Sequence, residues 1–405
     1  AINYYAKQSL LFGSFGSNGF YGLSTLAGHL LTADYKMFMN LFISLPYLAT
    51  GKSINAFMLC YTLTCFVPMW FALLMGAKKV RTWFAPARKN RLAPLYYPLC
   101  AGAMALWPMF LWPATHGMPD AFGLVFVAAI LLLTVDYRFE KLHPRRLACL
   151  FAATLALILT RRWYMFWIVA YYAVYVLFTL VWAARRRTLP VVLGNLLKFG
   201  VPSLLVIIVV LLPTFRTVLT TDYADLYGSY YGGGFVPNLV AQVQRQGVLW
   251  LLLCLAGLAV ALRKKAARAP ALELLASSLL AMALFTHTQS LGDHQSLILA
   301  PAYLGLVFCA LAALCTVGDT LPACAGAAAA ALLFAANFGN ALCLPAAHVQ
   351  TLLLSNESLD LTRRTDLPQM KAVTDFVLEN CTSDETVYIN IDTDGYSGGT
   401  FAYSD

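Results

Sequence analysis

Charged residues are scarce in this sequence. Asp, Glu, Lys and Arg make up 12% of its 405 residues and hydrophobic residues 60%, whereas charged residues are about 25% of an average soluble domain. A chain of this composition cannot cover its surface with polar groups. An ordinary water-soluble domain is therefore excluded.

Paired cysteine motifs and glycine-rich nucleotide loops are also missing. Nine of the ten cysteines lie in or beside apolar runs, and only Cys381 lies in a polar segment. This spacing predicts neither a disulfide framework nor a cysteine metal site. The 26 glycines form no nucleotide-binding pattern.

Long apolar runs are what the sequence has instead. They recur from Ile54 to Leu344, and a backbone in hydrocarbon must satisfy its own hydrogen bonds, as a helix does. Their continuity, without alternation, excludes a β-barrel. We expect an all-α polytopic membrane protein with about ten spans, at 53–75, 93–113, 117–136, 146–160, 163–184, 200–219, 247–262, 271–286, 296–317 and 321–345.

Basic residues gather in alternate connections between these spans. Four connections on one side hold 18 of the 28 Lys and Arg residues: Lys78, Lys79, Arg81, Arg88, Lys89, Arg91, Arg138, Lys141, Arg145, Arg146, Arg185, Arg186, Arg187, Lys198, Arg263, Lys264, Lys265 and Arg268. By the positive-inside rule that side is the cytoplasm. The net charge of +9 thus reflects topology and contact with anionic membrane lipid, and we expect no nucleic acid partner.

The opposite side holds the polar segments. We expect residues 1–52 to form a first extracytoplasmic loop with a pair of interfacial or re-entrant helices, and residues 53–345 to form the transmembrane domain. Residues 346–405 are expected to be an extracytoplasmic α/β tail, with a helix at 370–379 and a strand at 387–391. Because the chain starts at Ala1 without a methionine, we expect it to be part of a longer one, with the tail cut short.

Acidic residues are missing from the middle of the predicted spans. Asp120, Asp136 and Glu273 lie near predicted span ends, and Asp319 lies in a tight connection. A proton- or sodium-coupled transporter normally needs a carboxylate inside the membrane. The distribution therefore disfavours coupled transport.

One basic pair departs from the positive-inside pattern. The run Arg161-Arg162-Trp163-Tyr164 falls on the outer side. Arginine pairs bidentately with phosphate, so this pair, with Tyr164 beside it, is predicted to hold a lipid phosphate. The alternative is that both arginines only extend to the membrane surface from span ends. If they bind phosphate, we expect alanine at either position to abolish activity and keep stability.

Two more outer segments contain candidate substrate-binding residues. A short connection carries His287, Gln289, Asp293 and His294, which can serve as acid or base or bind a sugar or phosphate. Its spacing fits no standard zinc site, and a solvated loop remains the alternative.

The second segment is the helix start at His116 to Asp120. Asp120 either complements the helix dipole or faces an outer cavity. A loop at 222–234 is rich in aromatic residues, glycine and carboxylates, which suits either sugar binding or an interfacial aromatic belt.

In their order along the chain these segments resemble the GT-C superfamily of membrane glycosyltransferases, which includes protein mannosyltransferases and aminoarabinose transferases. The residues that carry the resemblance are Tyr4 to Ala6, Gly13 to Tyr21, Ser44 to Pro46, Gly51 to Ser53, Gly117 to Leu124, Arg161 to Tyr164, Asp222 to Tyr231, Gln289 to Gln295 and the tail.

The resemblance implies a GT-C-like bundle that transfers a sugar from a polyprenyl-phosphate donor to an envelope glycan, lipid or protein acceptor. It implies a catalytic carboxylate in the first outer loop, for which Asp34 is the candidate unless that residue precedes Ala1. The family has metal-dependent and metal-independent members, so a divalent metal is possible. We expect a bacterial plasma membrane protein with its site facing outside. The alternatives are a flippase or other transporter of lipid-linked glycans, and a non-catalytic envelope assembly protein.

Overall fold

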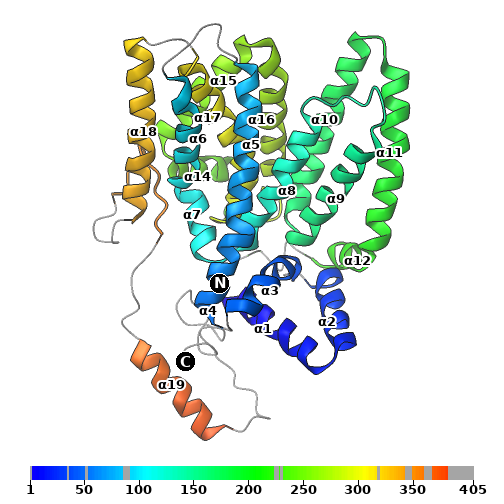
Figure 1. Cartoon of the computed structure of the whole chain (residues 1–405), viewed down its shortest axis with the longest axis vertical. Helices are drawn as coiled ribbons and strands as arrows, with labels where there is room; N and C mark the ends of the chain where they lie inside the picture. Colours follow the sequence, from blue (N-terminus) through cyan, green and yellow to red (C-terminus); the bar gives the residue numbers. More distant parts are fainter. Residues whose placement is uncertain are drawn as a thin grey trace.

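The computed structural model is a bundle of α-helices with a smaller helical layer at one end (Figure 1). It describes residues 2–33, 36–50, 53–84, 92–222, 228, 231–316, 320–342, 349–359 and 367–381. Within these ranges all regular elements are helical. The predicted all-α class is therefore confirmed, and the predicted strand at 387–391 lies outside the described residues.

The bundle is assembled from helices that run roughly along its long axis (Figure 1). They are α4 (Ile54–Tyr61) continued by the π-helical turn η1 (Thr62–Phe66) and α5 (Val67–Trp83), η2 (Ala93–Leu95) with α6 (Tyr96–Ala105), α7 (Pro108–Thr115), α8 (Pro119–Thr134), α9 (Pro144–Thr160), α10 (Tyr164–Arg185), α11 (Leu189–Val210), α15 (Val248–Arg263), α16 (Lys265–Thr286), η4 (Gln295–Leu299) with α17 (Ala300–Leu314), and α18 (Leu321–Leu342). Each of the ten predicted spans overlaps one of them.

Six described helices are long and apolar enough to cross a membrane, or eight if each of two bent pairs counts as one span. The multi-pass class is thus shown, whereas the count of ten is not. Two of the ten predicted spans are not among these eight, because they correspond to α8 and α9. These helices have only 16 and 17 residues, fewer than the ~20 that a bilayer requires.

Two spans are broken at residues whose chemistry explains the break. Between α6 and α7 the axis bends by 53°, just before Pro108, which cannot continue a helical hydrogen-bond ladder. The bend between α14 (Phe235–Gln246) and α15 is 102° and lies at Gly247, whose φ of +78° favours glycine. Consequently α14 lies across the bundle, where it can carry polar side chains.

The connections rich in Lys and Arg meet at one end of the bundle, which we call the basic end (Figure 1). Lys79 pairs with Asp136 of the next basic connection, and Arg138 pairs with Glu273 of α16 at 2.6 Å. Glu273 is 3% exposed and is the ninth residue of α16. The prediction that it lies near a span end is wrong, because α16 begins at Lys265 and not at 271.

The predicted span at 200–219 is displaced along the chain. The long helix here is α11, at Leu189–Val210, and α12 (Leu212–Thr220) follows as a separate short helix. In the sequence, the polar residues Asn195 and Lys198 indicate a connection between spans. In the structure both lie within α11, and Asn195 Nδ2 donates to the carbonyl oxygens of Phe139 and Glu140 at 2.9 and 3.3 Å. Lys198 accordingly belongs to a helix and not to a basic loop.

The opposite end, called the site end, carries the N-terminal helices α1 (Ile2–Ser17), α2 (Gly19–Leu31) and α3 (Phe38–Thr50) (Figure 1). Three helices stand where the sequence predicts a pair. Buried Lys36 attaches them to the bundle, since its Nζ donates to Thr214 Oγ1 of α12 at 3.0 Å. The predicted tail helix is confirmed as α19 (Leu367–Asn380).

Helix α15 packs so closely on α17 that only glycine fits at position 257. A Cβ there would lie 1.8 Å from the Leu306 carbonyl oxygen, whereas Gly194 on α11 has no such neighbour within 4 Å. We expect Gly257→Ala to lower the midpoint of thermal unfolding in detergent by several degrees, because the two backbones must separate. Gly194→Ala is the control. Equal midpoints for the two variants would contradict the close approach.

Candidate functional site

Asp120 lies at the start of α8, at the site end of the bundle. Pro119 occupies the first helical position, and Met118 before it is extended, with φ −82° and ψ 137°. Proline suits this position because its missing N–H needs no partner there. The predicted helix start is confirmed, and the Asp120 carboxylate is fully buried at 0% exposure.

The connection between α9 and α10 surrounds this carboxylate with donors. Arg161 donates from Nε to Asp120 Oδ1 at 3.0 Å and from Nη2 to Oδ2 at 3.3 Å, and Trp163 Nε1 donates to Oδ1 at 2.8 Å. Tyr164 Oη donates to the Asp120 carbonyl oxygen at 2.6 Å. Because the Arg161 side chain is only 7% exposed, Asp120 neutralises a buried cation.

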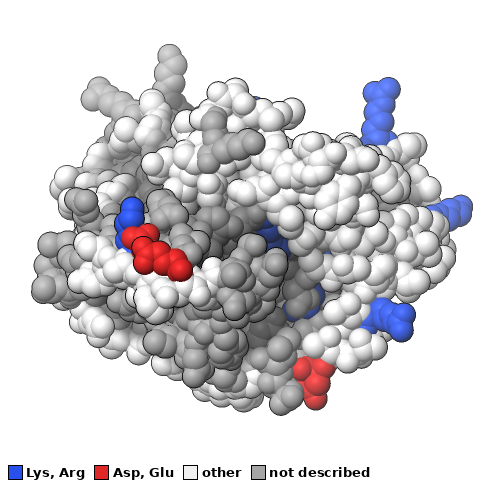
Figure 2. Space-filling model, turned by 90° about the horizontal axis from the view of Figure 1, so that it is seen from below, with Lys and Arg blue, Asp and Glu red and all other residues white. Residues whose placement is uncertain are grey.

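A cavity of about 460 Å³ opens beside the ion pair. Its polar lining is Arg161, Arg162, Thr288, Gln289, His294 and Gln295, and its apolar lining is Trp163, Met165, Phe166, Val169, Phe215, Val218, Leu284 and Phe285. The two predicted segments, around Arg161 and around His294, therefore meet in one cavity. Seen from the site end, basic side chains lie recessed among uncharged residues (Figure 2).

The apolar lining reaches the outer surface of the bundle. Val169 of α10 is 59% exposed and yet lines the cavity. Phe215 and Val218 of α12 and Leu284 of α16 continue this wall. The cavity is thus amphiphilic, with cationic and amide groups on one side and hydrocarbon on the other.

The other predicted residues that the structure describes do not line the cavity. The His116 ring stacks on Trp112 at 4.1 Å between ring centroids, and Trp112 lies 6.0 Å from the His294 ring in a near-parallel orientation. Asp293 pairs with Arg245 at 2.9 Å. His287 is exposed at the end of α16.

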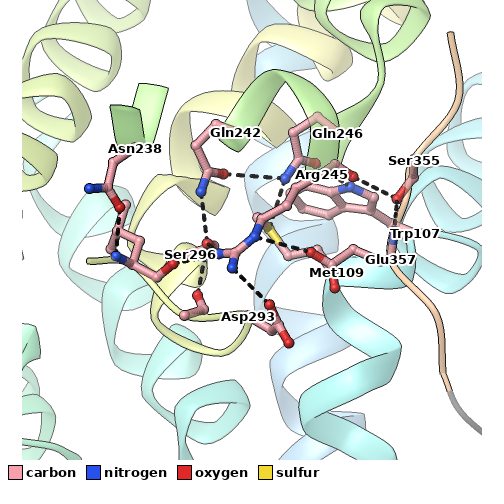
Figure 3. Close-up of polar contacts among 12 residues, drawn as sticks. Trp107, Met109, Asn238, Gln242, Arg245, Gln246, Asp293, Ser296, Ser355 and Glu357 are labelled. Atoms are coloured by element: carbon pink, nitrogen blue, oxygen red, sulfur yellow. Dashed lines mark hydrogen bonds and ion pairs between the residues drawn. The ribbon is translucent and has the colours of Figure 1, made fainter. Parts of the chain in front are cut away.

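A second polar network lies next to the cavity and is centred on Arg245 of α14 (Figure 3). Arg245 Nη1 donates to Ser296 Oγ at 2.6 Å and to the Leu291 carbonyl oxygen at 2.7 Å. Its other nitrogens pair with Asp293 and, at 3.5 Å, with Glu357. One guanidinium therefore joins α14, the connection before α17, and residues 349–359, which we call the strap.

Two glutamines on the same face of α14 extend this network toward α7. Gln242 Nε2 donates to Ser296 Oγ at 2.8 Å, and Trp107 Nε1 donates to Gln246 Oε1 at 2.9 Å. Gln246 Nε2 also points at Met109 Sδ, 3.8 Å away (Figure 3). Both glutamines are buried, so these contacts satisfy amides that would otherwise be costly to bury.

The strap closes the N-terminus of α15. The first N–H groups of a helix have no partner inside it, and here the carbonyl oxygens of Leu352 and Leu353 accept from Val248 and Leu249 at 2.7 and 3.2 Å. Ser355 Oγ donates to the Arg245 carbonyl oxygen at 2.6 Å. The strap is thus an integral part of the site end.

Of the Arg245 network, only Asp293 is among the candidates predicted from the sequence. Its members on α14 are Asn238, Gln242, Arg245 and Gln246. Their spacing of three and four residues places them on one face of a helix. That periodic polar stripe beside an apolar span is the signal that identifies a buried polar helix face.

Two predictions about chemistry are not tested by the site. Asp34, the candidate catalytic carboxylate, lies outside the described residues. Among the residues that are described, no three His, Cys, Asp or Glu side chains are grouped to hold a metal ion.

Comparisons with models of protein families, with curated proteins and with solved structures find no match to this chain. The resemblance to the GT-C superfamily therefore rests on the motifs of the sequence. The function has to be inferred from the geometry of the site.

Burial of Arg161 argues against the expectation that its replacement leaves stability unchanged. Arg161→Ala would leave the Asp120 carboxylate buried without its cation, which costs roughly 3–5 kcal/mol. We expect a large fall in the midpoint of thermal unfolding in detergent. Arg216→Ala is the control, because Arg216 is exposed on α12. A midpoint for Arg161→Ala equal to that of the control would show that the buried pair does not stabilise the fold.

The strap should respond to pH through Glu357. Burial, followed by the nearby Asp293, raises the pKa of Glu357 from 4.5 to about 7. The folded state then holds a proton that the unfolded strap releases, so the attachment weakens as pH rises through this interval. We expect amide hydrogen exchange in residues 349–359, corrected for the intrinsic rate, to accelerate between about pH 5 and pH 8. Glu357→Gln should remove that acceleration, and a variant that keeps it would contradict this role.

Proposed function

We propose that this protein is a membrane glycosyltransferase that takes a sugar from a polyprenyl-phosphate donor. The acceptor is an envelope glycan, lipid or protein on the extracytoplasmic side. The observation that carries the proposal is the amphiphilic cavity, in which Arg162 and four polar residues of the 288–295 connection share walls with apolar residues of three helices. A phosphate joined to both a sugar and a polyprenyl chain has this same division of polarity.

Charge supports a phosphodiester in particular. Arg161 is neutralised by Asp120, so its side chain adds little net charge to the cavity. Arg162, which lines the same cavity, brings a second guanidinium group to it. A polyprenyl-phosphate sugar carries one negative charge, and it becomes doubly charged when the sugar leaves. A fixed arginine stabilises that added charge in the transition state.

The apolar wall supports entry of the donor from the bilayer. Phe166, Val169 and Phe215 line the cavity next to Arg162, and Val169 is also on the exposed surface of α10. A prenyl chain can occupy this wall without leaving hydrocarbon.

One observation favours coupled transport as a second candidate. The buried pair of Glu273 and Arg138 lies in the bundle, and Glu273 lines a small cavity of about 90 Å³ together with Lys79 and Tyr171. Ionisable groups inside membrane spans often belong to proton paths. Flux of a fluorescent lipid-linked glycan across proteoliposomes with a pH gradient, compared with Glu273→Gln, tests this alternative.

The proposed function predicts that Arg162 binds the donor. In proteoliposomes containing an envelope lipid extract and radiolabelled undecaprenyl-phosphate mannose, glucose or arabinose, wild type should transfer label from one donor. Arg162→Ala should reduce kcat/KM by about 10- to 150-fold, the effect of one charged hydrogen bond. Arg162→Lys should retain part of the wild-type kcat/KM, because lysine keeps the charge without the bidentate geometry.

Arg216→Ala is the matched control, since Arg216 lies on α12 between two lining residues and is itself not in the lining. Loss of activity in the control would indicate a general effect of charge at this end. Full activity of Arg162→Ala would remove the phosphate-binding role.

A further inference from the structure

His294 has a defined position in the wall of the cavity. It directly precedes η4, and its ring lies beside the stack of Trp112 and His116. His294 lines the cavity, whereas Trp112 and His116 do not. Within the described ranges no residue forms a hydrogen bond with the His294 ring nitrogens. The His294 ring is thus supported by the Trp112 ring and also borders the cavity, where a ligand would lie.

The Arg245 network holds residues on both sides of His294. Arg245 pairs with Asp293 immediately before it and donates to Ser296 Oγ two residues after it. Leu291 N–H donates to Asn238 Oδ1 at 2.8 Å. A ring fixed by packing and by the hydrogen bonds of its loop is preorganised, as catalytic groups must be.

The electrostatic surroundings of His294 are balanced. Two ion pairs act on it: Asp120 with Arg161, and Asp293 with Arg245. His116 lies beyond Trp112 in the same stack. Burial lowers the pKa of His294 below its ordinary value, while the two carboxylates oppose this shift and the two arginines add to it. The imidazole is therefore neutral near pH 7 and able to accept a proton.

We propose that His294 is the general base that activates the acceptor. This inference rests on the proposed function. A ring nitrogen of His294 takes the proton of an acceptor hydroxyl as the oxygen bonds to the anomeric carbon. The bond from that carbon to the phosphate oxygen breaks, and its electron pair leaves with the polyprenyl phosphate. The products are the glycosylated acceptor, an imidazolium and a phosphate dianion, so charge and atoms balance.

His287 provides a matched control in the same connection, because it is exposed and outside the cavity lining. Removal of a general base typically slows the chemical step by about 100- to 10,000-fold. We expect His294→Gln to slow single-turnover transfer by such a factor while it leaves binding of radiolabelled undecaprenyl-phosphate sugar near that of wild type. His287→Gln should match wild type in both measurements.

Two further measurements separate catalysis from a structural role. The single-turnover rate of wild type should fall in acid with a midpoint below about pH 6.5, because protonated imidazole cannot accept the hydroxyl proton. The same acid limb should appear in Glu357→Gln, where the strap no longer titrates. Added imidazole should restore part of the transfer by His294→Gly, which loss of folding would not permit.

His294→Gln with a transfer rate and acid limb equal to those of wild type would overturn the assignment and leave the proposed function intact. A wild-type rate that shows no fall at any acid pH at which the protein stays folded would also overturn it, even if the variants do not fold. Failure of wild type to transfer from any of the donors would reject the proposed function itself.

Discussion

The buried pair of Asp120 and Arg161 determines how the site end is built. A carboxylate without access to water needs a cation and further donors, and here the connection between α9 and α10 supplies them from Arg161 and Trp163. That requirement brings the connection against the start of α8. Gly123 permits the approach, because a Cβ there would lie 2.1 Å from the Tyr164 ring. The position of Arg162 in the cavity follows from this docking.

The cavity and the Arg245 network are two parts of one arrangement. Both use the connection between α16 and α17: Gln289 and His294 line the cavity, while Asp293 and Ser296 bind Arg245. Neighbouring residues of a single connection thus separate into ligand-facing and scaffold-facing groups. A change in the scaffold, such as ionisation of Glu357, acts on the same connection that presents His294.

Much of this could be predicted from the sequence, and the failures have physical causes. Length and apolarity predict helices, so each predicted span overlaps one. The run from Arg161 to Tyr164 and the connection around His294 stood out because polar residues are unusual beside apolar spans. Sequence patterns do not show which charges neutralise each other. Asp120 was therefore assigned to two alternatives, and Arg161 was expected to be dispensable for stability. The Arg245 network was missed because its members come from three segments that only the folded chain brings together.

The strap has a consequence for how the protein is made. The partners of Val248 and Leu249 are Leu352 and Leu353, and Ser355 binds the Arg245 backbone from 110 residues farther along the chain. During synthesis α15 must therefore be inserted well before the groups that close its N-terminus have left the ribosome. The hydrogen bonds that the strap makes with α14 and α15 can form only after α16, α17 and α18 have been synthesised. The Arg245 network is accordingly complete only after the strap has been synthesised.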